Sequence, residues 1–297
     1  METKQLAAFC AVVERKSFSQ AAERLGVTQP AVSLQIRALE ERLGQRLLDR
    51  SGRRVEPTEV GRRLYRNAQR MLNLEENMLA DVAAADEGKL AGTLKIGAST
   101  GPGAHLVPIL LCEFQRAHPG LRVALSISDT QAVIEQVAAR ELELGVVGAL
   151  RRHRSLEFEP LARDEIVLAV PPGHQAAGGN VTLEELQLET LIVMQEGAGV
   201  RQVVEEELRR AGLPLRGLRP QLELGLQESV KSAVAAGYGV AFISRTAIEG
   251  ELAAGTLAWA RVADIEPSRQ LYVVQARARP ATRAAGAFLE FTRDRLT

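Results

Sequence analysis

The first group of side chains that could do chemistry lies in the segment TQPAVSLQIR, residues 28–37. Gln29 and Arg37 carry paired hydrogen-bonding groups of the kind that match adenine and guanine edges in the major groove of DNA. Thr28 and Ser33, which carry hydroxyls, and the apolar Leu34 lie in the same segment. The candidate base-reading residues are therefore Thr28, Gln29, Pro30, Ser33, Leu34 and Arg37.

A second group is the pair Ser99 and Thr100, which follows an apolar run and precedes the Gly-Pro-Gly turn at residues 101–103. Hydroxyls beside the unpaired N–H groups of a helix N-terminus form a natural seat for an anion. The same two residues could equally serve as ordinary caps of the following helix. The pattern predicts a ligand-binding pair of hydroxyls, with capping as the alternative.

Residues 97–101 also match the pattern G-x-S-x-G, which surrounds the nucleophile of many serine hydrolases. Ser99, Asp164 and His174 would supply the required chain order, but no other feature supports the last two. Catalysis is the minor alternative, and we expect the chain not to be an enzyme. The histidines show no metal-ligand spacing, so we expect neither a metal site nor a cofactor.

Two short helices joined by a tight turn, over residues 17–43, would position the first group. Gly26 suits the left-handed backbone conformation that ends a helix, and Thr28 offers a hydroxyl cap to the next one. Helix, turn, helix is the geometry that places a second helix in the major groove, although helical hairpins are also common in bundles. The apolar positions recur at helical spacing, at Ala21, Ala22 and Leu25 and then at Val32, Ile36, Leu39 and Leu43.

Arginines gather directly after this hairpin. Ser51 and Gly52 mark a turn between two short extended segments, as in a β-wing. A basic turn beside a reading helix has the form of a clamp on DNA phosphates, with Arg50, Arg53 and Arg54 as candidates. An ordinary solvated stretch would more often mix charges of both signs. The arginines of residues 47–66 are Arg50, Arg53, Arg54, Arg62, Arg63 and Arg66.

The run QLAAFCAVVERKSFSQAAERLGVTQPAVSLQIRALEERLG, followed by LLDRSGRRVEPTEVG, resembles the winged helix-turn-helix of LysR-type bacterial transcription regulators. The resemblance covers residues 1 to about 66 without a gap. One departure is Leu34, where the family usually carries a basic or polar residue. The resemblance implies sequence-specific binding to double-stranded operator DNA.

A long helix is predicted to begin after Thr58, its N-cap, and to run to about Glu87, where Gly88 ends it. Such a helix could lie on its own domain. We expect it instead to pair two copies of the chain, because a long exposed apolar seam needs a partner. In the family the matching helix joins subunits, often into tetramers, so a homodimer through this helix and a homotetramer are expected. The seam residues are Val60, Leu64, Ala68, Met71, Leu74, Met78 and Val82.

From residue 92 onward, short apolar runs alternate with amphipathic helices, which indicates a parallel sheet of βαβ units. Two α/β lobes of this kind leave a ligand cleft at the carboxyl ends of their strands. Residues 91–297 resemble the effector-binding half of the same family, which is similar to periplasmic binding proteins. The predicted division is a winged helix-turn-helix over 1–58, a linker helix over 59–89 and a two-lobed α/β effector domain over 90–297. Lobe I takes about 90–164 and 268–297, and lobe II about 165–267.

The loop at residues 195–201 resembles family members that carry Ser and Thr where this chain has Ala198 and Val200. Loss of two hydroxyls favours a ligand held by backbone amides and by Arg201, whose guanidinium can pair with a carboxylate or phosphate. An ion pair between Arg201 and Glu205 is the alternative. The resemblance also places Asp129, Thr130 and Ser229 at the cleft. The candidate effector-binding residues are Ser99, Thr100, Asp129, Thr130, Gln195, Arg201 and Ser229, and the expected effector is a small molecule, with an anion among the candidates.

With 46% apolar and 25% charged residues over 297 positions, the chain has an ordinary globular composition and room for more than one domain. Residues 1–66 hold 13 Lys and Arg against 8 Asp and Glu, a charge of +5, and the remainder carries −5. A basic end on an acidic body suits a DNA reader attached to a different kind of domain. Cys10 and Cys112 lie in apolar helical patterns, which predicts buried structural thiols. Neither a signal peptide nor a membrane-length apolar run is found, so we expect a cytoplasmic protein without a membrane partner.

These observations predict a transcription regulator whose DNA binding or activation is modulated by a small metabolite in the cleft. Two alternatives from other classes remain open. One is a serine hydrolase that uses Ser99, and the other is a ligand-binding module without a regulatory role.

Overall fold

The computed structural model describes residues 1–50, 55–84, 89–151, 153–218, 220–277 and 282–296. The chain folds as two compact units, Met1–Leu94 with His118–Arg122, and Lys95–Ala117 with Val123–Thr297. Each unit has its own buried apolar side chains, in separate clusters.

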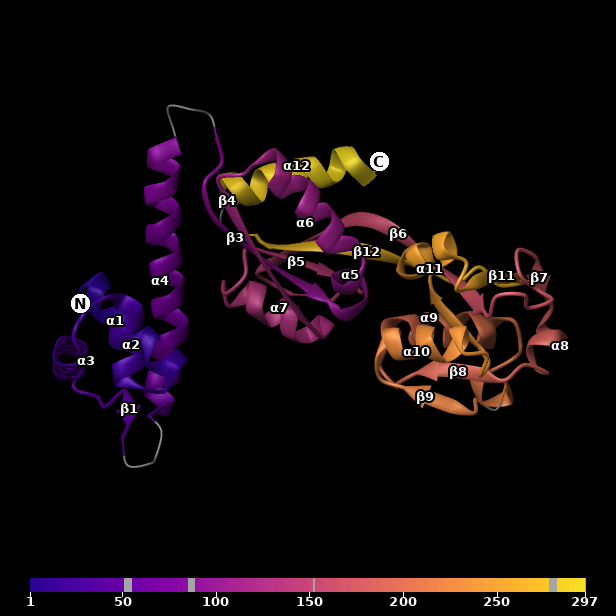
Figure 1. The fold of residues 1–297 in the computed structure, drawn as a ribbon, viewed down its shortest axis with the longest axis horizontal. Coiled ribbons are helices and arrows are strands. Elements are labelled where there is room, and N and C mark those ends of the chain that lie inside the picture. Colours follow the sequence, from indigo (N-terminus) through magenta and orange to yellow (C-terminus); the bar gives the residue numbers. More distant parts are fainter. Residues whose placement is uncertain (51–54, 85–88, 152, 219, 278–281, 297) are drawn as a thin grey trace. The chain divides into compact units, whose positions relative to one another are not determined.

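The N-terminal unit begins with three helices, α1 (Thr3–Arg15), α2 (Phe18–Leu25) and α3 (Gln29–Leu43), which pack around one core (Figure 1). Two short strands follow, β1 (Leu48–Asp49) and β2 (Glu56–Pro57), which pair antiparallel with Leu48 opposite Pro57. The arms of the predicted wing are therefore present. The turn at residues 51–54, which carries Arg53 and Arg54, lies outside the described residues.

Glycines end both helices of the hairpin, as the sequence predicts for Gly26. Gly26 follows α2 with φ 67° and Gly44 follows α3 with φ 64°, a left-handed conformation that costs glycine little. The prediction of a hydroxyl cap at Thr28 is wrong. Thr28 has the extended backbone of an N-cap residue, but its side chain makes no capping hydrogen bond. Pro30, the second helical residue, has no N–H to donate, and the N–H of Ala31, the third, makes no hydrogen bond to the Thr28 side chain.

The long helix α4 (Glu59–Ala84) starts where the sequence predicts. The hydroxyl of Thr58 accepts a hydrogen bond from Gly61 N at 3.0 Å and donates one to the carbonyl of Arg46 at 2.9 Å. The predicted end near Glu87 and Gly88 lies outside the described residues. One face of α4 packs on the core through Ala68, while other apolar side chains remain exposed. The exposed seam residues are Val60, Met71, Leu74, Met78 and Val82, and Leu79 beside them is exposed too.

The second unit is built on a mixed sheet with the strand order β4-β3-β5-β12-β6-β10-β8-β9. β3 pairs parallel with β5, β10 with β8, and β8 with β9, as βαβ units require. The expectation of a purely parallel sheet is wrong for two strands, because β12 runs antiparallel to β5 and β6, and β6 antiparallel to β10. The strands are β3 (Gly92–Ser99), β4 (Leu121–Ser128), β5 (Leu144–Val147), β6 (Leu156–Val170), β7 (Asn180–Val181), β8 (Leu191–Met194), β9 (Leu222–Leu224), β10 (Val240–Ser244), β11 (Ala258–Val262) and β12 (Ser268–Ala276).

Strand β6 connects the two lobes. Its first part pairs with β12 and its second part with β10 and β11, so one strand belongs to both halves of the sheet (Figure 1). Helices cover the sheet, and several begin where a parallel strand ends. They are α5 (Thr100–Ala104), α6 (Leu106–Ala117), α7 (Thr130–Ala138), α8 (Leu183–Leu186), α9 (Gly199–Arg210), α10 (Gln227–Ala235), α11 (Glu249–Ala254) and α12 (Arg283–Leu296).

The two cysteines differ in their surroundings. Cys10 is buried in α1, and burial raises the pKa of its thiol to about 12. The prediction of a buried thiol is wrong for Cys112, which is exposed on α6. The buried face of that helix is made by Val107, Leu110, Leu111 and Phe114, and residue 112 points away from it.

Candidate nucleic-acid interface and ligand cleft

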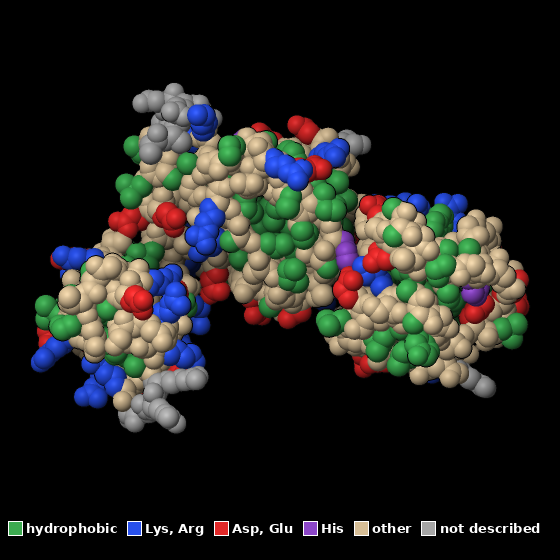
Figure 2. Space-filling model, viewed as in Figure 1, with side chains coloured by type: hydrophobic (Ala, Val, Ile, Leu, Met, Phe, Trp, Pro, Cys, Tyr) green, Lys and Arg blue, Asp and Glu red, His purple; other side chains and the backbone are tan. Residues whose placement is uncertain are grey.

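The outer face of α3 is open to solvent. Gln29 and Arg37 are exposed, Ser33 is half-buried, and 67% of the Leu34 surface is accessible. The opposite face buries Val32, which fixes the rotation of the helix. Figure 2 shows Lys and Arg side chains gathered over the surface of this unit. The helix therefore presents the predicted reading residues together, with Thr28 and Pro30 exposed at its N-terminus.

Gln29 and Arg37 each have a local partner. Gln29 Oε1 accepts a hydrogen bond from the Ser19 hydroxyl at 3.1 Å, and Arg37 Nε donates to Glu41 at 3.1 Å. The Arg37 and Glu41 side chains are 74% and 67% exposed, so the pair holds little energy and can exchange for a base or phosphate.

Arg50 is the described member of the predicted phosphate clamp. Its guanidinium donates to Glu40 at 3.3 Å and lies over the Phe18 ring at 4.9 Å. Glu40 also accepts from the backbone N–H of Leu47 at 2.8 Å. These contacts tie the start of the wing to α2 and α3.

A cleft of about 370 Å³ lies in the second unit, between loops of both lobes. Ser99 ends β3 and Thr100 begins α5, while Asp129 and Thr130 follow β4, so the sheet brings both pairs to one edge. Gln195 follows β8 and reaches the same cleft from the other lobe. Five of the seven predicted effector residues thus line one cavity, because parallel strands end at the same edge of a sheet.

Their contacts explain which groups remain available. The buried Ser99 hydroxyl accepts a hydrogen bond from Gly148 N at 3.3 Å, and Thr100 makes only a long contact, 3.5 Å, to the Ser128 carbonyl. Asp129 caps α7 by accepting from Ala132 N at 2.9 Å. The hydroxyl pair therefore faces the cleft, and the carboxylate is occupied by its own helix.

Arg201 and Ser229 are not among the described residues that line this cleft. Arg201 donates to Glu205 at 2.7 Å, to Glu223 at 2.7 Å and to the Met194 carbonyl at 2.9 Å. These bonds to Glu205 and Glu223 raise the pKa of its guanidinium further. The ion pair between Arg201 and Glu205, the alternative that the sequence offered, is present.

Several polar residues of the cleft had no sequence prediction, and two of these are largely buried. Arg269, at the start of β12, and Gln227, the first residue of α10, both line the cavity and are largely buried. Arg269 Nε donates to Asp164 Oδ2 at 2.8 Å, across the antiparallel pairing of β12 with β6. No local sequence signal marks Arg269, since its position depends on pairing with a strand about a hundred residues earlier.

The hydrolase alternative requires Ser99, Asp164 and His174 to touch. Asp164 is bonded to Arg269, and His174 Nε2 lies 3.2 Å from Glu189. Ser99 has Gly148 N as its partner. Ser99, Asp164 and His174 therefore do not form a catalytic triad.

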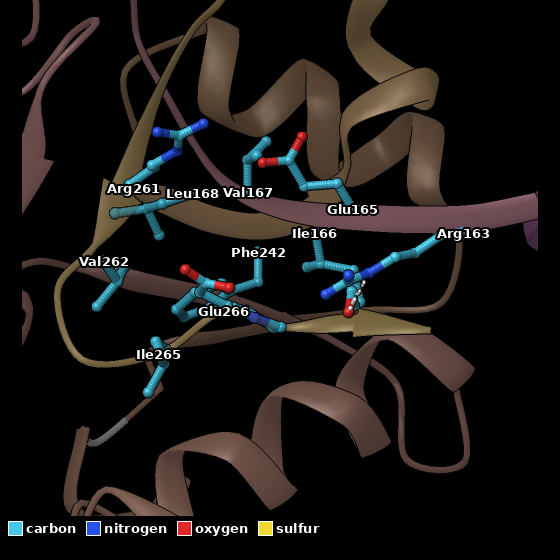
Figure 3. A pocket seen from close by; sticks show the side chains of 12 residues that line it. Arg163, Glu165, Ile166, Val167, Leu168, Phe242, Arg261, Val262, Ile265 and Glu266 are labelled. Atoms are coloured by element: carbon cyan, nitrogen blue, oxygen red, sulfur yellow. Dashed lines mark hydrogen bonds between the residues drawn. The ribbon is translucent and has the colours of Figure 1, made fainter. Parts of the chain in front are cut away.

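A second cavity, of about 410 Å³, lies beside β6 and β11 (Figure 3). Ile166, Leu168 and Phe242 form its apolar wall, and Arg163 and Glu165 stand at its edge. None of the predicted site residues lines it in the described part of the chain.

The described residues hold no group of three or more His, Cys, Asp or Glu side chains placed to bind a metal ion. None of the helices there is long and apolar enough to cross a membrane.

Comparison with known proteins gives two family matches. Residues 3–62 match the family "Bacterial regulatory helix-turn-helix protein, lysR family", and residues 87–297 match "LysR substrate binding domain". The sequence is 37% identical over 296 residues to a "Probable RuBisCO transcriptional regulator" of Cyanophora paradoxa, which covers 97% of this chain and 90% of that protein.

Solved structures share the fold. One described as "Crystal structure of full-length CbnR complexed with the target DNA complex" matches with a TM-score of 0.74 at 24% identity, over 99% of each chain. Another, of the Synechocystis PCC6803 CcmR regulatory domain in complex with 2-PG, matches with a TM-score of 0.60 at 24% identity, over 69% of this chain and 97% of that one.

Proposed function

The chain belongs to the LysR family of bacterial transcriptional regulators, and we propose on that basis that it binds operator DNA through α3 and responds to a small molecule held in the cleft. The observation that carries the proposal is the outer face of α3. It presents Gln29 and Arg37 to solvent on a helix whose other face is fixed in the core. Both side chains can form paired hydrogen bonds with bases.

The proposed roles of the N-terminal residues follow their exposure and chemistry. Gln29, Ser33, Leu34 and Arg37 read bases or meet the thymine methyl group, with Thr28 and Pro30 at the groove edge. Arg50, Arg53 and Arg54 contact phosphates, which adds affinity for any DNA. A regulator that acts on bacterial chromosomal DNA works in the cytoplasm, and we place this chain there.

We propose the domain division stated above, 1–58, 59–89 and 90–297, with α4 as the dimer contact. The support is the exposed apolar seam along α4, which includes Met71, Leu74 and Met78. A second copy of the helix would cover it. Dimers present two reading helices to two half-sites, and a tetramer would pair two such dimers.

We assign the cleft to effector binding rather than to catalysis. The hydroxyls of Ser99 and Thr100 face a cavity of metabolite size, whereas Ser99, Asp164 and His174 have separate partners. The CcmR regulatory domain, which shares this fold, was solved in complex with 2-PG. A ligand changes DNA binding when it favours one arrangement of the subunits, with a coupling of about 1–3 kcal/mol.

The DNA-binding half is tested by selecting sequences from a random duplex library with the full chain. Binding to the selected site is then measured by fluorescence anisotropy. Gln29→Ala should cost about 1–3 kcal/mol on that site and leave unrelated DNA unaffected. Gln45→Ala is the matched control, because that exposed amide lies beyond the end of α3. Failure to enrich any sequence, or an equal loss on all DNA, contradicts base reading by α3.

The effector half is tested on the same selected site. A cell extract freed of macromolecules by ultrafiltration is added in fractions, and DNA affinity and footprint are followed. One or more fractions should change either quantity. If no fraction changes either one, the assignment of the cleft to regulation is refuted, whatever the outcome for Gln29.

A further inference from the structure

Arg269 is held on one edge only. Its Nε donates to Asp164, whose carboxylate also accepts from the hydroxyls of Ser244 and Thr246. A guanidinium carries five N–H donors, and the terminal nitrogens Nη1 and Nη2 make no hydrogen bond with the described residues. Only 9% of the Arg269 side chain is exposed. Because Arg269 lines the cleft, the free edge can donate there to an acceptor that is not part of the chain.

Three glycines make room for that free edge. A Cβ at Gly101 would lie 2.7 Å from Nη2, and a Cβ at Gly199 would lie 2.7 Å from Nη1. At Gly148 it would lie 3.1 Å from Nη1. All three glycines line the cleft, and they come from β3–α5, from the end of β5 and from the start of α9. Any larger residue at 101 or 199 would displace the guanidinium.

The start of α9 adds a second set of donors beside Nη1. The N-cap residue Ala198 has no capping side chain in the described structure, so the first N–H groups of this twelve-residue helix have no side-chain acceptor. A helix N-terminus also carries a partial positive charge. Two positive features side by side repel each other unless an anion lies between them.

Gln227 gives an independent sign of a missing acceptor. It is only 6% exposed, it lines the same cleft, and its Nε2 has no hydrogen-bond partner among the described residues. An amide nitrogen buried without a partner costs free energy unless a ligand supplies the acceptor. Arg269 lies on β12 and Gln227 on α10, so the fold, and not one local motif, brings both residues to the cleft.

The acidic residues of the cleft do not oppose an anion at this end. Asp129 is occupied as the cap of α7, and Glu196 is exposed at the cavity edge. Asp164 lies on the far side of Arg269 and is 5% exposed. The buried end of the cleft therefore holds donors whose nearest carboxylate is already paired.

We infer that the effector carries a compact oxyanion group, a phosphate or a carboxylate, and that Arg269 binds this group together with Gln227 and the N-terminus of α9. The inference rests on the proposed function of the cleft and specifies the class of molecule it takes. Arg269, not Arg201, is the anion-binding arginine. The rest of the molecule extends toward the polar edge formed by Gln131, Arg151 and Gln195.

The test uses the full chain and a set of probes that separates the two oxyanions. Glycerol carries neither group and serves as the neutral probe. Glycerate carries the carboxylate, glycerol 3-phosphate carries the phosphate, and 3-phosphoglycerate carries both. Inorganic phosphate is the simplest probe, and sodium chloride at equal ionic strength is the salt control. Binding is followed by thermal shift and by calorimetry. At least one oxyanion probe should raise the Tm above the chloride control, while glycerol should not.

The variants locate the anion. Arg269→Gln should weaken binding of that probe about tenfold or more, since it removes a charge-assisted pair of bonds. Gln227→Leu keeps the charge of the cleft and should weaken binding by a smaller factor. Arg201→Gln is the matched control, an arginine of similar burial and also paired with carboxylates, and should leave affinity within twofold, roughly the error of the comparison.

The outcomes are separable. If Arg269→Gln fails to fold, Arg269→Lys, which keeps the charge but not the paired geometry, and Gln227→Leu carry the test. Three results would overturn the inference. The first is no stabilisation by any oxyanion probe, and the second is an affinity of the Arg269 and Gln227 variants equal to that of the parent chain. The third is a loss of affinity in Arg201→Gln alone. Each of these results leaves the DNA selection and the extract-fraction assay unchanged, so a regulator with a neutral effector would be recognised.

Discussion

Replacing Gly61 by alanine should destabilise the N-terminal unit, although the same change usually stabilises a helix. Gly61 lies in the first turn of α4 and is buried against the strand that leads into the wing. A Cβ there would lie 2.1 Å from the Leu47 carbonyl oxygen, well under the 3.0 Å that real Cβ contacts respect. Helix and strand would have to separate by about 1 Å to relieve this contact.

The separation has a calculable consequence. The Leu47 carbonyl accepts a hydrogen bond from Thr58 N at 2.9 Å, which the movement would stretch or break. Overpacking costs about 1–3 kcal/mol and a lost hydrogen bond about 1 kcal/mol, while alanine regains about 1 kcal/mol of helix propensity. The net loss of stability is therefore about 1–3 kcal/mol, and the start of the wing shifts with it.

Gly286→Ala is the control for this prediction. Gly286 lies in α12, and a Cβ there would have nothing within 4 Å. It should stabilise the chain by about 0.5–1 kcal/mol. Both variants are compared in the full chain by urea unfolding followed by circular dichroism, with anisotropy on the selected DNA as the second readout. Equal stability and equal DNA affinity of Gly61→Ala and the parent chain would refute the packing of α4 on the Leu47 carbonyl.

Three further outcomes are expected. Arg53→Ala should weaken binding to all DNA sequences and lower the slope of log affinity against log salt by about 1, measured by anisotropy; an unchanged slope would contradict a phosphate contact. Met78→Glu, which places a charge on the exposed seam of α4, should shift the chain toward monomer in sedimentation analysis, and an unchanged assembly would remove α4 from the interface. Iodoacetamide near neutral pH should modify Cys112 and spare Cys10, whose raised pKa and burial keep it a thiol; mass spectrometry that finds Cys10 modified first would contradict the packing of α1.

Local features of the chain were predictable because local chemistry decides them. Apolar spacing placed α2, α3 and α4, and Gly26 adopts the left-handed backbone that was predicted to end α2. The cap at Thr58 formed as predicted, and the side-chain cap at Thr28 did not; Pro30 removes one of the two N–H groups a cap can use, and the other, on Ala31, does not bond to the Thr28 hydroxyl.

The cleft was predictable only in part. Ser99, Thr100 and Asp129 follow strands of one sheet, and parallel strands deliver such residues to one edge whatever their separation in the chain. Arg201 follows the same logic at the start of α9, yet its side chain turns to Glu205 and Glu223. A pattern locates the backbone of a residue, and competition between partners then sets the direction of a long flexible side chain.

The sequence by itself determined the family, the helix-turn-helix with its outward polar face, and the alternation of strands and helices, since all of these depend on spacings of a few residues. Only the tertiary structure decided that β12 pairs antiparallel with β6 in the register that sets Arg269 opposite Asp164. That register follows from packing of whole strands about a hundred residues apart, which no short segment specifies. In the folded chain, Gly101, Gly148 and Gly199 surround the guanidinium of Arg269. The arginine of the cleft is therefore Arg269, whereas the sequence pattern had pointed to Arg201.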